Sequence, residues 1–389
     1  MKNTNKHILI PGISGVIGRR LMNGLAAINA PFYGLINSGH TKYDLDNNPI
    51  ITKNGVYITP GLDVNQRINL AQKNGEKILG IIDEEFNWDK IAMILDCCTK
   101  KGTDINLKQV YGKNIPVVVQ GGTIVDPSYP HFSPTFMKDS SSLFNQPITH
   151  VKNVSCNATG LSMVLSDIAL TLGSTKRIKQ VEANLFRRYK DPEDTKSIIT
   201  EPFTKNDKYG KDVGLANKEL SNKISSMASL NPWESHHYTT LKINIDGRYD
   251  LDKIRSSLIN NQRLAYLTKD PVDEKIQTCN DYNIDKIKNG LDKIVDAATL
   301  VGLPHGDSTV NLVHAYQDRN NDLCLSLYIS QRWSSIPGTY DLIWGISDIG
   351  EFRQVNTFKE AYERTNSLPL AYGFTFPETK EMLENKLND

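Results

Sequence analysis

The most constraining feature of the sequence is a short apolar strand that runs directly into a glycine-rich turn and then into a helix. Residues 7–11 (HILIP) precede Gly12, Gly15 and Gly18, and a helical pattern covers 18–30. Glycines at such a turn let backbone N–H groups approach a pyrophosphate at the positive end of the helix dipole. The spacing therefore predicts a dinucleotide site, with a purely structural glycine turn as the alternative.

Short apolar runs recur along the first part of the chain, separated by helical or polar segments. They are partly β-branched and bounded by Gly, Pro, Asn or Asp, which is typical of strands buried on both faces. After the first strand, the predicted strands cover 32–38, 55–59, 77–83, 93–98, 116–122 and 151–156. Strands that alternate with helices form βαβ units and a parallel sheet. We therefore expect an α/β domain with a doubly wound parallel sheet of the Rossmann type.

The pattern changes after residue 156. Residues 157–173 carry apolar side chains at helical spacing, and three later segments alternate apolar and polar residues as strands do. These strand-like segments are 180–189, 237–245 and 323–330. Long alternating strands indicate an antiparallel sheet with one solvated face. The second domain is therefore predicted to be an α+β catalytic domain with a mainly antiparallel sheet.

The domain boundaries follow from this change. Residues 1–155 with 336–389 are assigned to the dinucleotide-binding domain, and residues 156–335 to the catalytic and substrate domain. The polar segment 190–235 is predicted to be a long loop, and 298–303 is predicted to be helical.

Composition and charge exclude several classes of protein. The 389 residues carry 45 Lys and Arg against 44 Asp and Glu, a net charge of +1, so nothing indicates a nucleic-acid or membrane partner. No apolar stretch has the length of a membrane span, and the first residues lack the apolar core of a secretion signal. Five cysteines without a Cys-x-x-Cys pair argue against disulfides and against a thiolate metal site. The sequence therefore predicts a cytoplasmic protein that binds no metal.

The end of the second predicted strand bears on which dinucleotide is bound. Segment 34–40 (GLINSGH) holds no acidic residue that would bind a ribose 2′-hydroxyl and repel a 2′-phosphate. Asn37, Ser38 and His40, with Lys42 nearby, offer donors to such a phosphate. The sequence therefore favours NADP, or the use of both NADP and NAD, although the same residues also suit an ordinary turn.

Cys156 is the candidate nucleophile, because it ends a predicted buried strand and opens the helix that starts at Asn157. Thiols at helix N-termini have lowered pKa values, and the amides there can hold an oxyanion. A thiolate beside a hydride acceptor indicates oxidation of an aldehyde through a thioester, or the reverse reaction. An inert core role is the alternative for Cys156. It is the expected role of the other four cysteines, Cys97, Cys98, Cys279 and Cys324.

Thiol chemistry of this kind needs a base, and histidine is the usual one near neutral pH. Of the eight histidines, His236 and His237 are best placed because they open a predicted strand; a pair of surface histidines is the alternative. Arg187 and Arg188 lie at the end of another predicted strand, where adjacent guanidinium groups suit an anionic ligand. Solvated arginines, or arginines paired with carboxylates, are the alternative there.

Several motifs, taken in order, resemble the archaeal-type (type II) glyceraldehyde-3-phosphate dehydrogenase family, over about residues 5–345. The landmarks are SGVIGRR (14–20), CTKKG (98–102), VVVQGG (117–122), VSCNATGL (154–161), FRRYKDP (186–192) and SQRW (330–333) before SIPG (335–338). VSCNATGL and the Arg-Arg-x-x-Asp-Pro pattern are the most specific of these.

The resemblance implies a set of ligand contacts, with Cys156 as catalytic nucleophile and His237 as catalytic histidine. Together with the turn and strand-end residues above, the cofactor set is Gly12, Gly15, Val16, Ile17, Gly18, Asn37, Ser38, Thr99, Gly121, Gly122, Arg188 and Gln331. The substrate set is Ser155, Asn157, Thr159, Arg187 and His236. The resemblance also implies a phosphorylated aldehyde, glyceraldehyde 3-phosphate first, with inorganic phosphate as the second substrate. It further implies a place in glycolysis and a homo-oligomer, either tetramer or dimer.

The chain departs from the family pattern where the substrate would bind. Ala158 replaces a threonine, and segment 208–212 (KYGKD) stands where the family has His-His-Gly-Pro-Asp. Segment 337–339 (PGT) replaces Pro-Glu-Asn, and the glycine spacing is closer to that of aspartate-semialdehyde dehydrogenases. Two alternatives therefore stay open. One is a related dehydrogenase for another phosphorylated aldehyde or a semialdehyde, and the other is a non-catalytic cofactor-sensing or interaction protein of the same fold.

Overall fold

The structure is a computed structural model of the chain. It describes residues 6–13, 15–36, 54–61, 63–73, 75–98, 102–103, 106–107, 111, 114–121, 128–190, 204–205, 207–234, 236–266, 310–330, 334–346, 349, 352 and 354–368. Two compact units are present. Unit 1 comprises Met1–Phe132, Ser141–Ser155 and Gly338–Thr365, and unit 2 comprises Ser133–Ser140, Cys156–Pro337 and Asn366–Asp389. That the two units fold as separate domains stays a prediction.

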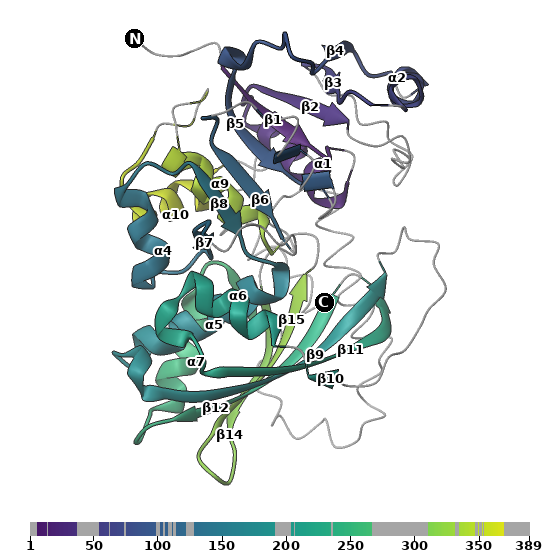
Figure 1. Ribbon diagram of the computed structural model, residues 1–389. Coiled ribbons are helices and arrows are strands. Elements are labelled where there is room, and N and C mark those ends of the chain that lie inside the picture. The colour runs from purple at the N-terminus through teal and green to yellow at the C-terminus, as the bar shows by residue number, and fades with distance from the viewer. Residues whose placement is uncertain are drawn as a thin grey trace. The chain divides into compact units, whose positions relative to one another are not determined.

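Unit 1 is built on an eight-stranded sheet in which every strand pair is parallel (Figure 1). Its strands are β1 (His7–Pro11), β2 (Phe32–Ile36), β3 (Val56–Ile58), β4 (Ile78–Ile81), β5 (Ile91–Asp96), β6 (Val117–Gln120), β7 (His131–Phe132) and β8 (His150–Asn153). The spatial order is β4-β3-β2-β1-β5-β6-β8-β7, so the direction of winding reverses between β1 and β5. This confirms the Rossmann-type prediction.

The core of unit 1 explains why the apolar runs identified its strands. Ile8, Leu9 and Ile10 are 0% exposed, because a parallel sheet is covered on both faces. Its helices are α1 (Val16–Ala27), α2 (Val64–Lys73) and most of α9 (Ile336–Ile346) and α10 (Phe358–Asn366), with short 3₁₀ turns η1 (Trp88–Lys90) and η2 (Leu143–Asn145). Helix α4 (Lys138–Ser142) begins in a segment of unit 2 and ends in unit 1. The Tyr340 hydroxyl of α9 donates to the Leu21 carbonyl of α1 at 3.4 Å, which joins these two helices.

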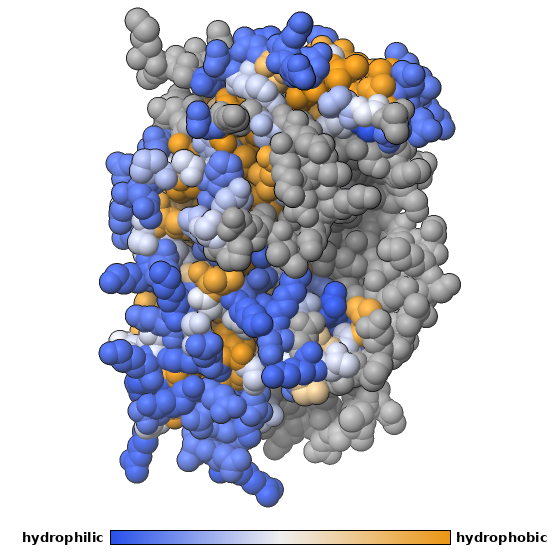
Figure 2. Space-filling model, viewed as in Figure 1, coloured by the Kyte–Doolittle hydropathy of each residue, from blue (hydrophilic) through white to orange (hydrophobic). Residues whose placement is uncertain are grey.

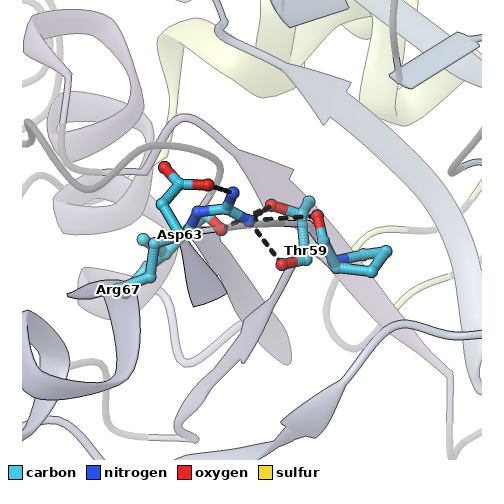
Figure 3. Close-up of polar contacts among 5 residues, drawn as sticks. Thr59, Asp63 and Arg67 are labelled. Atoms are coloured by element: carbon cyan, nitrogen blue, oxygen red, sulfur yellow. Dashed lines mark hydrogen bonds and ion pairs between the residues drawn. The ribbon is translucent and has the colours of Figure 1, made fainter. Parts of the chain in front are cut away.

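The Arg67 side chain of α2 binds the backbone that directly follows the carboxyl end of β3 (Figure 3). Its buried guanidinium donates to the Thr59 carbonyl, to Thr59 Oγ1 at 2.6 Å, to the Pro60 carbonyl at 3.2 Å and to the Asp63 carboxylate. The Thr59 N–H and hydroxyl both donate to the Ile36 carbonyl at 3.1 Å. One arginine therefore holds the ends of β2 and β3 together.

Hydrophobic residues gather near the edge strands β2–β4, at the top of the view in Figure 2. Ile81 of β4 is 39% exposed there. A row of ring contacts runs through His7, Tyr33, Tyr57, Phe86 and Trp88. Half-buried aromatic rings therefore pack against this part of the sheet.

Unit 2 is built on a seven-stranded sheet with the order β10-β11-β9-β12-β15-β14-β13. Its strands are β9 (Ile178–Lys190), β10 (Thr204–Lys205), β11 (Ile224–Glu234), β12 (His236–Ile245), β13 (Leu264–Tyr266), β14 (Val310–Gln317) and β15 (Leu323–Ser330). The β9–β11 and β13–β14 pairs are parallel and the other four pairs antiparallel. The predicted mainly antiparallel sheet is therefore confirmed.

Helices lie on one face of the unit 2 sheet (Figure 1). They are α5 (Cys156–Thr171), α6 (Lys208–Ala216) and α7 (Leu251–Asn260), with 3₁₀ turns η3 (Thr175–Arg177) and η4 (Lys218–Leu220). Helix α5 is buried along most of its length, as its apolar spacing predicted. No helix of the described residues is both long enough and apolar enough to cross a membrane.

The predicted long loop over 190–235 is wrong, because α6 and β11 occupy part of it. Helix α6 buries Tyr209, Val213 and Ala216 at helical spacing, and small residues let its backbone approach β11 closely. A Cβ atom on Gly210 would lie 2.6 Å from the Ile224 carbonyl oxygen, and Ser226 and Ser229 of β11 are buried. The polar composition of segment 190–235, rich in Lys and Asp, concealed this helical spacing. The predicted helical segment 298–303 lies outside the described residues.

Candidate active site

The glycine turn after β1 is compact because side chains are absent from it. Gly12 has φ +71°, and a Cβ atom there would lie 2.9 Å from the backbone carbon and oxygen of Cys97. A Cβ atom on Gly18 would lie 2.8 Å from the Ile13 Cα atom and would also overlap the Gly12 carbonyl oxygen. Residues 12 and 18 therefore admit only glycine without a shift of the backbone.

Helix α1 begins directly after this turn. Gly15 is its N-cap residue and has no side chain to satisfy the first N–H groups, while the Gly15 N–H donates to the Gly12 carbonyl at 2.9 Å. The amides of the first helical turn are therefore directed toward the end of the sheet where β1 finishes, with the positive end of the helix dipole. This arrangement suits the negative charge of a pyrophosphate.

The other residues of the predicted cofactor set are placed as follows. Val16 and Ile17 begin α1, and Gly121, with φ +66°, follows β6 and donates its N–H to the Asn153 carbonyl at 3.1 Å. Arg188 lies inside β9 in unit 2, where its backbone is in register with Asn231. Five of the set lie outside the described residues: Asn37, Ser38, Thr99, Gly122 and Gln331.

Three buried polar residues at the ends of β6, β8 and α9 were not identified from the sequence. The Asn153 amide donates to Gln120 Oε1 at 3.3 Å and to Thr339 Oγ1 at 3.0 Å, and the Thr339 hydroxyl donates to Gln120 Oε1 at 3.1 Å. Because Thr339 is more than 180 positions from Asn153, no local pattern links them. They fix the carboxyl end of the sheet beside Gly121.

Cys156 and His237 come together in unit 2. The Cys156 Sγ atom lies 3.5 Å from the His237 Nε2 atom, although the residues are 81 positions apart. Cys156 is the first residue of α5 and is half-buried, while His237, in β12, is 3% exposed. A thiol at a helix N-terminus with an imidazole at this distance has the arrangement of an activated nucleophile and its base.

Polar side chains surround this pair. Asn157 is buried beside Cys156 in α5, and Tyr209 of α6 is 5% exposed. Burial raises the pKa of Tyr209 and the charge of Cys156 adds to this, while the Arg187 guanidinium and a hydrogen bond with Asn157 oppose the rise. Within the described part of the chain, the buried atoms Asn157 Oδ1 and Arg187 Nε have no hydrogen-bond partner. An acceptor and a donor are therefore open to a polar ligand.

The remaining predicted substrate residues are more dispersed. Ser155 is 7% exposed and is the last residue of a segment of unit 1, directly before Cys156. Thr159 is fully buried inside α5. His236 is the first residue of β12, and its backbone is in register with Ser330.

The other described cysteines differ from Cys156. Burial raises the pKa of the Cys97 and Cys98 thiols well above the usual range, and the Asp96 carboxyl adds to this effect. Burial also raises the pKa of Cys324. These three thiols therefore stay protonated near neutral pH. Cys279 lies outside the described residues. Among the residues that the structure describes, no three His, Cys, Asp or Glu side chains are grouped to hold a metal ion.

Comparison with known proteins places these features beside archaeal dehydrogenases. The glyceraldehyde-3-phosphate dehydrogenase of Methanobrevibacter smithii is 24% identical over 264 residues, 67% of this chain and 73% of the relative. Glyceraldehyde-3-phosphate dehydrogenase 1 of Methanosarcina acetivorans is 26% identical over 52% of this chain and 58% of the relative. The enzyme of Pyrobaculum arsenaticum is 25% identical over 64% of this chain and 70% of the relative.

The matched region thus spans between just over half and about three quarters of these relatives. No family model matches the chain. At this low identity the similarity extends to the general class of enzyme and not to a particular type within it. The matches support a dehydrogenase of the glyceraldehyde-3-phosphate dehydrogenase family.

Proposed function

We propose that this protein is an NAD(P)-dependent, phosphorylating aldehyde dehydrogenase of the archaeal type that acts through a thioester at Cys156. The observation that carries the proposal is the 3.5 Å distance between Cys156 Sγ and His237 Nε2 at the start of α5. Glyceraldehyde 3-phosphate is the first candidate substrate, because the relatives are named for it. A glycolytic role, a cytoplasmic location and a homo-oligomeric state, tetramer or dimer, belong to the same proposal.

The residues of unit 1 suit a dinucleotide. Gly12 and Gly18 let the turn after β1 pack closely on its own backbone, and the amides of the first turn of α1 are suited to hold the pyrophosphate. NADP or NAD is the proposed cofactor, since the sequence after β2 has no acidic residue to exclude a 2′-phosphate. When bound, the oxidised nicotinamide supplies a hydride acceptor.

The chemistry that this chain's own residues would perform begins at Cys156. His237 Nε2 takes the proton of the Cys156 thiol, and the thiolate adds to the aldehyde carbon, which forms a C–S bond and leaves an alkoxide. His237 returns the proton to this oxygen, which gives a hemithioacetal. His237 Nε2 accepts the hydroxyl proton of the hemithioacetal as its carbon loses hydride, which leaves a thioester. An oxygen atom of inorganic phosphate then attacks the thioester carbonyl carbon. The C–S bond breaks, the acyl phosphate leaves and the thiolate is restored.

The polar residues around the thiol give the substrate its proposed contacts. Asn157 has an open acceptor atom and Arg187 an open donor atom among the described residues, which suit a hydroxyl and an anionic group. The proposed substrate set also includes Ser155, Thr159 and His236. Arg188 and Gln331 are proposed to contact the cofactor. Open polar atoms near a nucleophile favour a hydrophilic aldehyde over an apolar one.

A panel of aldehydes tests the proposal. The purified chain is mixed with NAD or NADP and with glyceraldehyde 3-phosphate, other phosphorylated aldehydes or an unphosphorylated semialdehyde, and formation of reduced nicotinamide is followed by absorbance. We expect turnover with a phosphorylated aldehyde that needs inorganic phosphate and is absent in Cys156→Ser. Turnover by Cys156→Ser at the rate of the unaltered chain would refute the thioester route.

One structural observation favours a second candidate, a dehydrogenase for another phosphorylated aldehyde or for a semialdehyde. Tyr209, in the segment that departs from the family pattern, is buried and interacts with Cys156, Asn157 and Arg187. A phenol of this size beside the thiol changes the shape and hydrogen bonding of the space for the substrate. The same panel separates the two candidates, because a semialdehyde preferred over glyceraldehyde 3-phosphate supports the second.

A further inference from the structure

The carboxylate of Asp96 lies at the carboxyl end of β5, next to the glycine turn but outside every set of residues discussed above. Asp96 is fully buried. Its Oδ1 atom accepts the Cys98 N–H at 2.8 Å and the Thr103 hydroxyl at 3.0 Å, and its Oδ2 atom accepts the Tyr111 hydroxyl. Three donors therefore converge on one buried carboxyl group.

A second layer of contacts orients these donors. The Asn106 amide donates to the Tyr111 hydroxyl at 3.1 Å and contacts Cys98 Sγ at 3.5 Å. The Tyr111 N–H donates to the Asn106 carbonyl at 2.9 Å, and the Tyr111 ring packs against the core of unit 1. Thr103, Asn106 and Tyr111 are thus held close to the end of β5.

The backbone that follows Asp96 packs directly against the glycine turn. A Cβ atom on Gly12 would lie 2.9 Å from the backbone carbon and oxygen of Cys97 and 3.1 Å from the Cys98 nitrogen. The Cys97 N–H also donates to the Pro11 carbonyl at 3.0 Å. Because the backbones at the ends of β1 and β5 are in van der Waals contact, a shift of one displaces the other.

A gain in folding stability does not readily explain why a carboxyl group is buried at the end of β5. Burial raises the pKa of Asp96, and the three hydrogen bonds only oppose that rise. Apolar groups of the same shape in place of both a buried polar group and its partners can leave stability nearly unchanged. The carboxylate instead fixes the backbone conformation, because its Oδ1 atom accepts the Cys98 N–H and so holds the turn over residues 96–98.

We propose that Asp96 is a positioning residue for the dinucleotide, acting through the Cys98 N–H and the Cys97 backbone to hold the Gly12 turn where a pyrophosphate would bind. The inference rests on the proposed dinucleotide site. Thr103 and Tyr111 act in the same way, one step further from the cofactor.

The test is the dissociation constant of NADPH and of NADH, followed by nicotinamide fluorescence, in the full chain. We expect Asp96→Asn to raise it about 10- to 100-fold, since small displacements of a binding group have effects of this size. Tyr111→Phe, which removes one donor and little else, is expected to raise it about 3- to 10-fold. Thr103→Val raises it similarly, and Thr103→Ser, which keeps the hydroxyl, restores it.

Two controls separate positioning from general loss of structure. Phe358→Leu alters the fully buried aromatic contacts with Phe132 and Phe144 elsewhere in unit 1, and it should lower the melting temperature without changing the dissociation constant. The alkylation rate of Cys156 in cofactor-free protein should be the same in all variants. If Asp96→Asn does not fold, Tyr111→Phe and the Thr103 pair decide the matter.

The results distinguish failure of the inference from failure of the proposed function. If the unaltered chain binds a dinucleotide and Tyr111→Phe and Thr103→Val bind it equally well, the positioning role is refuted. An equal loss of affinity in Phe358→Leu would also refute it. No binding of either dinucleotide by the unaltered, folded chain would refute the proposed cofactor, and the inference with it.

Discussion

The start of α1 packs so closely on the preceding turn that a Cβ atom on Gly18 would lie 2.8 Å from the Cα atom of Ile13. We therefore expect Gly18→Ala to lower the free energy of unfolding of the cofactor-free chain by about 1 to 3 kcal/mol, since backbone must move to admit the methyl group. Urea unfolding without cofactor measures this.

The matched control is Gly15→Ala, where φ is −77° and the nearest contact of a Cβ atom would be the Gly12 carbonyl oxygen at 3.2 Å. This variant should keep nearly the stability of the unaltered chain, yet bind NADPH more weakly because the methyl group faces the proposed phosphate site. Equal stability of the two variants would contradict the steric argument.

The contact between Cys156 and His237 predicts a specific pattern of kinetic losses. His237→Asn should lower the rate of aldehyde oxidation by about 10²- to 10⁴-fold, which is typical of the loss of a general base. It should also slow alkylation of Cys156 near neutral pH, since the imidazole no longer takes the thiol proton. Cofactor affinity should stay unchanged. Cys324→Ser is the matched control for labelling, and a labelling rate in His237→Asn equal to that of the unaltered chain would argue against the pairing.

Asp167 of α5 predicts a pH dependence of stability. Burial raises its pKa to about 6, although hydrogen bonds with Ser257 and Asn261 oppose the rise. The folded state therefore binds the proton more tightly than the unfolded state, in which the pKa is near 3.8. The stability linked to this group is fully present below pH 3.8 and is lost as the pH rises through about 6.

Asp167→Asn removes this loss, so it should stabilise the chain by about 1 to 3 kcal/mol at pH 8 and progressively less as the pH falls from 6 toward 4. Denaturant titrations across this range measure the difference. Asp252→Asn, at an exposed position on α7, should follow the pH profile of the unaltered chain. A stabilisation by Asp167→Asn that does not vary with pH would count against the buried charge as its cause.

The hydrogen bonds that the buried Arg67 guanidinium donates to Thr59 and Pro60 predict a loss of stability when this side chain is removed. Arg67→Met leaves the carbonyls of Thr59 and Pro60 without their guanidinium donor, so we expect a loss of about 2 to 4 kcal/mol in the free energy of unfolding. Asp63→Asn is the control, because the Asp63 side chain is 42% exposed and exposed ion pairs contribute less than about 1 kcal/mol. Similar losses in the two variants would show that the ion pair, and not the carbonyl contacts, stabilises the turn.

The sequence was sufficient where one local pattern determines the structure. The central strands β1 and β5 of unit 1 are buried on both faces, so each appears as a continuous apolar run, and the glycine turn after β1 follows from spacing alone. The placement of Cys156 at the start of α5 also follows from local sequence, since an apolar strand ends there and helical spacing begins. Chemical reasoning about the base left His236 and His237 open, and only the family resemblance singled out His237.

Sequence reasoning was insufficient where structure arises from contacts between distant polar residues. Asp96 with Tyr111, and Gln120 with Asn153 and Thr339, are held by hydrogen bonds that leave no periodic trace. Helix α6 differs, because Tyr209, Val213 and Ala216 are buried at helical spacing, but the polar composition of its segment indicated a loop. The position of Tyr209 near Cys156 was therefore not expected, although its segment was marked as a departure from the family pattern.

The position of His237 in β12 has a consequence for how this protein would respond to heat. His237 is in register with Ile329 of β15, and the next residue, Tyr238, is in register with both Tyr328 of β15 and Phe186 of β9. An imidazole carried by an interior strand keeps its place until that sheet melts. The pairing of His237 with Cys156 should therefore persist on warming until unit 2 unfolds. Labelling by a thiol reagent should change in the same step as the far-ultraviolet signal of the strands, because Cys324, which is buried in the folded sheet, then becomes accessible.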